Sequence, residues 1–287
     1  MLKDTLGARK GNPYRWRIVA PIIIAFLSLL VFTPSAFAAS HSLAASSNNH
    51  RVTHYHYLAL GDSLAFGVQP NNDFTHGYVN DIFNDLKSDG FQDHLNLGCP
   101  GESSITMIHG GCPSGSSPPY TQLATALGYL HAHAGQVKLV TLDIGANDLL
   151  KDSNISTCAI LPTFTSDLAT LDTNLNQVIL PQLHAALKVN GHLTGKLVMM
   201  NYYDPSQNLC PKLVKYTKIL NRHLADDVQG FGHIVNVFQA FGGNHTPNPH
   251  VCTLTWMCAA PPLGPDIHAT TKGYQVIANT FLDSIEH

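Results

Sequence analysis

The sequence has 287 residues, of which only 12% are charged, and its 16 lysines and arginines nearly balance its 19 acidic residues. This balance, with no basic run beyond the N-terminal segment, argues against a protein that binds nucleic acid by neutralising phosphates. A weakly charged surface instead suits a secreted protein that meets neutral or amphiphilic molecules.

The N-terminal segment predicts a signal peptide over residues 1–38. Basic residues precede an apolar stretch, 18–32, which is followed by Ala36-Phe37-Ala38, the small-residue pattern of a cleavage site. The apolar stretch is short for a membrane helix, which needs about 20 residues, and a retained anchor is the alternative. We therefore expect a mature chain from Ala39, a disordered segment over 39–52 and a single domain over 53–287.

Apolar, strand-like runs alternate with longer amphipathic stretches along this domain. The alternation predicts βαβ units and an α/β fold with a parallel sheet. The expected strands cover 55–60, 94–97, 138–144, 196–202 and 233–238, and the expected helices cover 77–86, 123–133, 164–187, 212–228 and 271–285. Long Gly- and Pro-rich loops follow at 99–119, 151–162, 201–211 and 241–265. Ligands of open parallel sheets bind beyond the carboxyl ends of the strands, so we expect these loops to form the site.

All six cysteines lie in these loops, and an even number of cysteines in an exported protein indicates disulfides. Small loops close most readily, which favours the local pairs Cys99–Cys112, Cys158–Cys210 and Cys252–Cys258. Structural zinc motifs favour tighter cysteine pairs. The less favoured alternative is therefore a zinc site formed by Cys252, Cys258, His245 and His250.

The tripeptide Gly61-Asp62-Ser63 follows the first expected strand and precedes a helical segment. A serine in this position lies near backbone N–H groups and the positive end of a helix, which suits a nucleophile. The alternative is that Asp62 or Ser63 only caps the helix, as these residue types commonly do.

A serine nucleophile needs a base, and among the 17 histidines His268 stands out. It lies on a Pro-rich loop just before the last expected helix, with Asp266 two residues earlier. In an extended loop residues i and i+2 point to the same side, so the carboxylate can orient the imidazole, as serine hydrolysis requires. A structural loop histidine is the alternative, but it leaves the neighbouring acid unexplained.

Three candidate donors for an oxyanion follow successive strands. Ser63 and Gly101 each offer a backbone N–H, and Asn147 in the GAND segment offers a side-chain N–H. Such donors must be aimed at the developing charge before the reaction begins. Asn and Gly are also ordinary turn residues, so it is their position at successive strand ends, together with a serine, that indicates an oxyanion site.

Four segments, GDS, NLGCPGESS, GAND and PDIHATTKGY, occur in this order between Gly61 and Tyr274. Together they resemble the signature blocks of the GDSL, or SGNH, hydrolase family. The resemblance implies a flavodoxin-like three-layer α/β/α fold with a five-stranded parallel sheet. It implies Ser63 as the nucleophile, His268 as the base, and Ser63, Gly101 and Asn147 as the oxyanion donors. It also implies hydrolysis of carboxylic esters without a cofactor, and the secreted, disulfide-linked form is similar to extracellular actinobacterial-type lipases and esterases.

The chain departs from the family pattern at the acid. The family usually places the acid three residues before the histidine, where this chain has Pro265. Asp266 can therefore orient His268 through its carboxylate or through its main-chain carbonyl, and both alternatives remain open.

We therefore expect a secreted, monomeric carboxylic ester hydrolase that uses Ser63, His268 and Asp266, with neither a metal nor a cofactor. Its substrate is expected to be a small-molecule, lipid or glycan ester, and nothing indicates nucleic acid or an obligate protein partner. The lack of an apolar, lid-like helix favours small or soluble esters. The alternatives are a polysaccharide O-acetyl esterase and an inactive secreted binding protein on the same fold. Three aromatic residues either contact the substrate or serve in packing: Tyr202, Tyr203 and Trp256.

Overall fold

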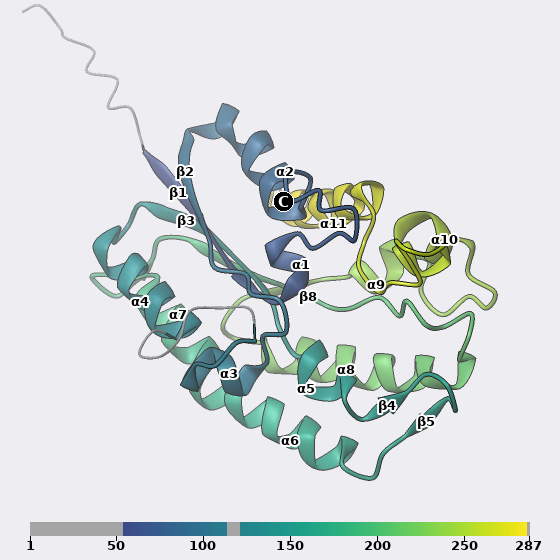
Figure 1. Ribbon diagram of the computed structural model, residues 1–287. Helices are drawn as coiled ribbons and strands as arrows, with labels where there is room; N and C mark the ends of the chain where they lie inside the picture. Colours follow the sequence, from purple (N-terminus) through teal and green to yellow (C-terminus); the bar gives the residue numbers. More distant parts are fainter. Residues whose placement is uncertain (1–53, 114–120, 286–287) are drawn as a thin grey trace, which may run out of the picture. The chain divides into compact units, whose positions relative to one another are not determined.

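The computed structural model describes residues 54–113 and 121–285, which form the α/β domain shown in Figure 1. The predicted signal peptide over 1–38 and the segment 39–52 lie outside the described residues. Among the described helices, none combines the length and the apolar character that crossing a bilayer requires.

The described residues contain a five-stranded sheet in which all neighbouring strands are parallel and the order is β2-β1-β3-β8-β9. The strands are β1 (Tyr55–Gly61), β2 (Phe91–Asn96), β3 (Val137–Asp143), β8 (Lys196–Met200) and β9 (His233–Val235). This is the strand order of a flavodoxin-like, doubly wound sheet, so the predicted fold class is confirmed. The central strands are buried on both faces, which explains their nearly continuous apolar sequence.

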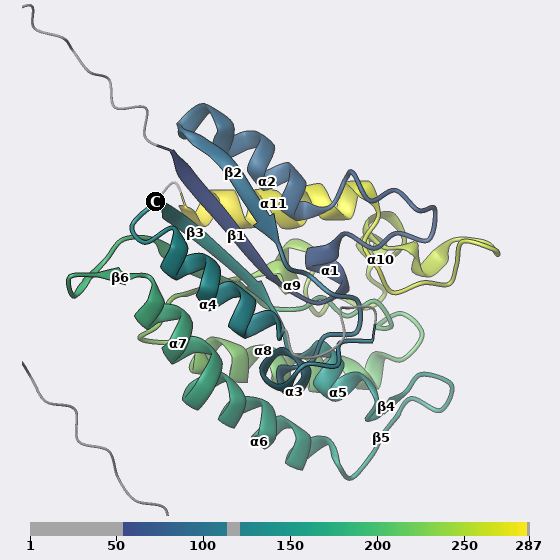
Figure 2. The same cartoon turned by 60° about the vertical axis from the view of Figure 1, so that its left-hand side comes forward.

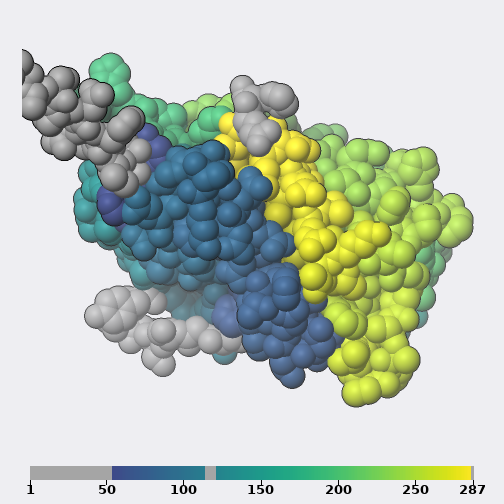
Figure 3. Space-filling model, turned by 90° about the horizontal axis from the view of Figure 1, so that it is seen from above, coloured from purple at the N-terminus to yellow at the C-terminus, as the bar shows by residue number. Residues whose placement is uncertain are grey.

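Helices cover both faces of the sheet, as the two views in Figures 1 and 2 show. One face carries α2 (Tyr78–Leu86) and α11 (Thr271–Ile285), which pack against each other; Figure 3 shows their segments in contact at the surface. The other face carries α4 (Gln122–Ala132), α6 (Phe164–Asn174), α7 (Leu180–Ala186) and α8 (Val214–Asp227). The domain is therefore the expected three-layer α/β/α arrangement.

Short elements connect these layers. The short helices are α1 (Ser63–Phe66), α3 (Ser104–His109), α5 (Ala146–Leu150), α9 (Val237–Ala240) and α10 (Pro249–Leu254). Two hairpins are formed by β4 (Ser153–Asn154) with β5 (Ala159–Ile160), and by β6 (Lys188–Val189) with β7 (His192–Leu193). Single 3₁₀ turns lie at η1 (Lys87–Asp89), η3 (Pro211–Leu213) and η4 (Trp256–Cys258).

The helix expected over residues 164–187 is interrupted. A π-helical turn, η2 (Leu175–Ile179), separates α6 from α7, and Pro181 is the second residue of α7. Proline has no N–H to donate, and its ring collides with the carbonyl four residues earlier in a regular α-helix. The wider π turn leaves room for that carbonyl.

Three disulfides join all six cysteines in the pairs expected from the sequence: Cys99–Cys112, Cys158–Cys210 and Cys252–Cys258. Their Cα–Cα distances are 6.5, 5.2 and 5.0 Å. The zinc alternative is wrong, because both of its cysteine sulfurs are bonded to each other.

A buried carboxyl between α6 and α8 gives the first stability prediction. Burial raises the pKa of Asp227 from 3.8 to about 6, even though the Asn176 amide donates to its carboxylate. The folded state therefore holds this proton more tightly than the unfolded chain. As pH rises from about 4 to about 6, the unfolded chain ionises first, so the free energy of unfolding decreases and then levels off.

We expect Asp227→Asn to be more stable than the wild type at neutral pH, by roughly 1 to 3 kcal/mol. This difference in stability should shrink towards pH 4, because there the folded wild type is protonated at position 227 and is as neutral as the variant. Thermal unfolding at a series of pH values measures it. The exposed neighbour provides the control, since Asp226→Asn should change stability little at any pH. A gain from Asp227→Asn that is constant with pH would contradict the assignment.

Candidate active site

A pocket of about 160 Å³ lies at the carboxyl ends of the central strands and is lined by Ser63, Asn147 and His268, among others. Ser63 begins α1, directly after β1, and Asn147 lies in α5, directly after β3. His268 lies on the loop before α11. Because β1 and β3 are adjacent and parallel, their carboxyl ends bring the first two residues to one edge of the sheet.

The turn that carries Ser63 is tightly constrained. The carboxylate of Asp62 caps α1 by accepting from the backbone N–H of Leu64 at 2.8 Å. The amide of Gln122 pairs with the backbone of Gly61, accepting from its N–H at 2.7 Å and donating to its carbonyl at 3.0 Å. Asp62 is therefore the capping residue, which leaves the Ser63 side chain to line the pocket.

Glycine is required at position 61 by a close approach of two strands. A Cβ atom there would collide with the carboxyl group of Asp143, which ends the neighbouring strand. Any larger residue would therefore displace the turn that carries Ser63.

His268 and Asp266 form a hydrogen-bonded pair. Nδ1 of the imidazole lies 2.7 Å from Oδ1 of the carboxylate, which also accepts the backbone N–H of His268 at 2.8 Å. The buried Tyr203 fixes this loop, since its hydroxyl donates to the carbonyl of Ile267 at 2.9 Å. The carboxylate, and not the main-chain carbonyl, thus contacts the imidazole. With Nδ1 engaged, Nε2 is the nitrogen available to a hydroxyl or a substrate.

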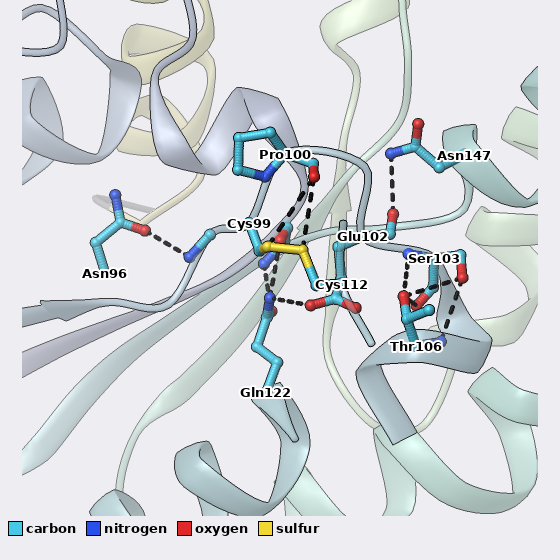
Figure 4. The surroundings of a disulfide bond; sticks show 11 residues. Asn96, Cys99, Pro100, Glu102, Ser103, Thr106, Cys112, Gln122 and Asn147 are labelled. Carbon is cyan, nitrogen blue, oxygen red and sulfur yellow. Dashed lines mark hydrogen bonds between the residues drawn. A yellow bond between two sulfur atoms is a disulfide. The ribbon is translucent and has the colours of Figure 1, made fainter. Parts of the chain in front are cut away.

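Asn147 is oriented by the loop after β2. Its side-chain N–H group donates to the carbonyl of Glu102 at 2.9 Å, as Figure 4 shows. An amide nitrogen carries two hydrogens, so one remains for a ligand. Gly101, one residue before Glu102, has a left-handed φ of 87°. Gly101 does not itself line the pocket, but this bond brings its segment to Asn147.

The same loop is fixed by a network around the Cys99–Cys112 disulfide (Figure 4). Gln122, which pairs with the backbone of Gly61, also donates to the carboxylate of Glu102 at 2.8 Å. One side chain therefore connects the turn of the candidate nucleophile with the loop of the candidate oxyanion donors. Gln122 could not be predicted as a site residue from the sequence, because nothing near it in the chain marks a site.

Asp148, the last residue of the GAND segment, ties α5 to α3. Its carboxylate accepts from the backbone N–H of Ser104 at 2.9 Å and from the Ser104 hydroxyl. Burial raises the pKa of Asp148, while these hydrogen bonds to Ser104 lower it. The contact fixes the position of α5, and with it Asn147.

The deeper wall of the pocket is apolar. It is formed by α5, the β4–β5 hairpin, α6, η3 and α8, and its side chains include Leu149, Ile160, Phe164, Leu213 and Leu220. The Cys158–Cys210 disulfide joins the hairpin to the segment before η3. This hydrophobic pocket is not predicted by the sequence, because its residues come from five separate elements.

The aromatic residues singled out from the sequence have different positions. Tyr202 and Tyr203 line the pocket but are almost completely buried, and the Tyr202 hydroxyl donates to Asp62 at 2.8 Å. Tyr203 stacks on Phe241 with a ring separation of 4.3 Å. Trp256 lies outside the pocket lining and is 3.4 Å from the side chain of Gln69. Both tyrosines thus support the site from beneath.

This parallel sheet, with its pocket at the strand ends, has the fold of the SGNH hydrolases. A lipase from a goat rumen metagenome superposes with a TM-score of 0.54 at 16% identity, covering 80% of this chain and 97% of that one. An acetylxylan esterase from Geobacillus stearothermophilus gives 0.51 at 14% identity, covering 82% and 96%. An extracellular lipase from Streptomyces rimosus gives 0.51 at 16% identity, covering 80% and 99%. At these identities the likeness establishes the fold alone.

The family follows from the sequence itself. The model of the GDSL-like lipase/acylhydrolase family matches residues 59–276, which is most of the chain. No curated protein matches the sequence at a significant level. The chain belongs to the GDSL-like lipase/acylhydrolase family, and it is a carboxylic ester hydrolase.

Proposed function

We propose that this enzyme is a secreted serine hydrolase that cleaves esters with an apolar acyl chain. The observation that carries the proposal is the joint placement of Ser63, Asn147 and His268 around one pocket, with Asp266 hydrogen-bonded to the imidazole. Serine hydrolysis requires a hydroxyl, a base and a carboxylate that orients the base.

In the proposed mechanism, Nε2 of His268 accepts the proton of the Ser63 hydroxyl while the oxygen attacks the ester carbonyl. The tetrahedral oxyanion is stabilised by the backbone N–H of Ser63 and by the side-chain N–H of Asn147, and the family resemblance implies the backbone N–H of Gly101 as a third donor. His268 then gives the proton to the leaving alcohol, and a water molecule releases the acid from Ser63 by the same steps. Asp266 stabilises the imidazolium that forms twice in each cycle.

The apolar pocket supports a preference for longer acyl chains. The acyl group stays attached to Ser63 during the reaction, and the pocket extends from Ser63 to apolar side chains of α6 and α8. Burying each methylene group there is favourable by about 0.8 kcal/mol. The sequence, which lacks a lid-like helix, favoured small esters, whereas the pocket favours an alkyl chain.

We expect kcat/KM for p-nitrophenyl esters to rise from acetyl towards octanoyl in the wild type. Ile160→Trp places a larger side chain in the pocket wall, so it should lower octanoyl hydrolysis by about tenfold or more and change acetyl hydrolysis little. Leu193→Trp is the matched control, because Leu193 is exposed in the β6–β7 hairpin and does not line the pocket. Best activity on acetyl esters, unaffected by Ile160→Trp, would instead favour an O-acetyl esterase.

Secretion is supported by the three disulfides, which persist in oxidising compartments, and by the signal-like N-terminal sequence. We expect the protein recovered from the culture medium of an expressing host to begin at Ala39. N-terminal sequencing measures this. Protein that stays with the membrane fraction and keeps residues 1–38 would show a retained anchor.

A further inference from the structure

Two carboxyl groups are buried together beneath the turn that carries Ser63. Asp62 follows β1 and Asp143 ends β3, and Gly61 and Asp143 are paired in the register of these strands. Asp62 is 2% exposed and Asp143 is not exposed at all. Within residues 54–113 and 121–285, neither carboxyl forms an ion pair with a lysine, arginine or histidine.

Asp143 contacts the backbone on both sides of Ser63. Its Oδ2 atom lies 3.4 Å from the backbone nitrogen of Asp62 and 3.3 Å from that of Ala65, which both donate to it. Its Oδ1 atom accepts from the Tyr78 hydroxyl at 2.8 Å. The same carboxyl group fills the place that a side chain at Gly61 would take. Asp143 therefore fixes the turn from beneath, without lining the pocket.

Asp62 has the stronger donors of the two acids. It accepts from the Leu64 backbone and from the Tyr202 hydroxyl, both at 2.8 Å. Such donors favour the ionised form of a carboxyl group. The remaining titratable groups that face the pair are a third buried carboxyl, phenols, which are neutral at neutral pH, and one imidazole: Glu102, Tyr57, Tyr78, Tyr202, Tyr203, Tyr274 and His268. Among the described residues, no lysine or arginine is therefore in place to offset two negative charges.

Two carboxylates in one buried site cannot both ionise near neutral pH. Burial raises the pKa of Asp143 well above its ordinary range, and the charge of Asp62 raises it further. Burial also raises the pKa of Asp62, but the hydrogen bond from Asp143 lowers it. The single negative charge thus belongs to Asp62 and the proton to Asp143.

We propose that Asp143 is a positioning residue that remains a neutral carboxylic acid, donates its proton to the Asp62 carboxylate and holds the Gly61–Ala65 turn that presents Ser63. The expected effect on activity rests on the proposed function, in which Ser63 is the nucleophile. The location of the proton does not depend on that role.

Replacing Asp143 by a neutral residue of the same shape tests the positioning role. An asparagine whose carbonyl oxygen takes the place of Oδ2 still accepts from the backbone N–H groups of Asp62 and Ala65, so Asp143→Asn should keep kcat within about threefold of the wild type. Asp143→Ala removes these contacts and should lower kcat by about tenfold to a hundredfold with KM little changed. Thr141→Ala is the control, because it removes another buried hydrogen-bonding side chain of β3 and should lower stability but not kcat.

The infrared difference spectrum between the wild type and Asp143→Asn at neutral pH tests the proton. We expect the carbonyl band of a protonated carboxylic acid in the wild type, shifted in deuterium oxide and absent from the variant. A missing band would overturn the proposal, as would an Asp143→Asn variant that does not fold or loses as much kcat as Asp143→Ala. If Ser63→Ala were to stay active, the proposed function would fail, while the band would still show which acid holds the proton.

Discussion

Ser63→Ala is expected to lower kcat for p-nitrophenyl esters by about four orders of magnitude or more, with the fold and KM little changed. The methyl group cannot attack a carbonyl, and the turn is held by Asp62, Gln122 and Asp143, none of which bonds to the Ser63 hydroxyl. The thermal unfolding temperature should therefore be close to that of the wild type. Steady-state kinetics and thermal unfolding measure the two effects separately.

A fluorophosphonate probe provides an independent measurement of the same residue. It should label the wild type and leave Ser63→Ala unlabelled. Ser166→Ala, which changes an exposed hydroxyl on α6, is the matched control and should be labelled like the wild type. Activity or labelling that survives in Ser63→Ala would show that another residue is the nucleophile.

His268→Ala is expected to reduce kcat about as much as Ser63→Ala, because serine and histidine act as one unit. Asp266→Asn keeps the shape of the side chain but removes the charge that stabilises the imidazolium. We expect it to reduce kcat by roughly 10²- to 10⁴-fold, which is less than the loss in His268→Ala. The 31% exposure of the carboxylate lets solvent replace part of its effect.

The kinetics of these two variants, measured side by side, decide the role of the acid. Asp283→Asn, which changes an exposed acid at the far end of α11, is the control for removing one negative charge away from the loop. An Asp266→Asn variant with nearly wild-type kcat would show that the hydrogen bond between Asp266 and His268 is not needed for turnover. Equal losses in both variants would show that the carboxylate alone orients the imidazole.

The sheet could be predicted from the sequence where its strands are buried on both faces. The expected strand 55–60 matches β1 to within one residue, and the last helix, 271–285, matches α11. The edge strand β2 begins at Phe91, three residues before the predicted start. The prediction began too late because Gln92 and Asp93 are exposed and break the apolar pattern. The π turn before Pro181 was missed for a similar reason, since the apolar spacing continues through it.

The candidate site was predicted where its residues stand beside recognisable turns. Ser63, Asn147 and His268 each follow a strand or precede a helix, and the structure places them around one pocket. The supporting residues were missed because their contacts are long-range. The Tyr202 hydroxyl reaches Asp62 across 140 positions of the chain, and Gln122 reaches Gly61 across 61. A lone acid at the end of an apolar strand is the signal that could have identified Asp143.

The packing of α2 against α11 has a consequence for biosynthesis. It brings the segments of Ser63 and His268 together, although ribosomes make the first some two hundred codons before the second. A nascent polypeptide that already contains the hydroxyl therefore has no imidazole to activate it. In the proposed mechanism the complete centre forms only after the last helix has been translated and docked, so an unfinished chain is expected to leave the esters of the cell that produces it intact.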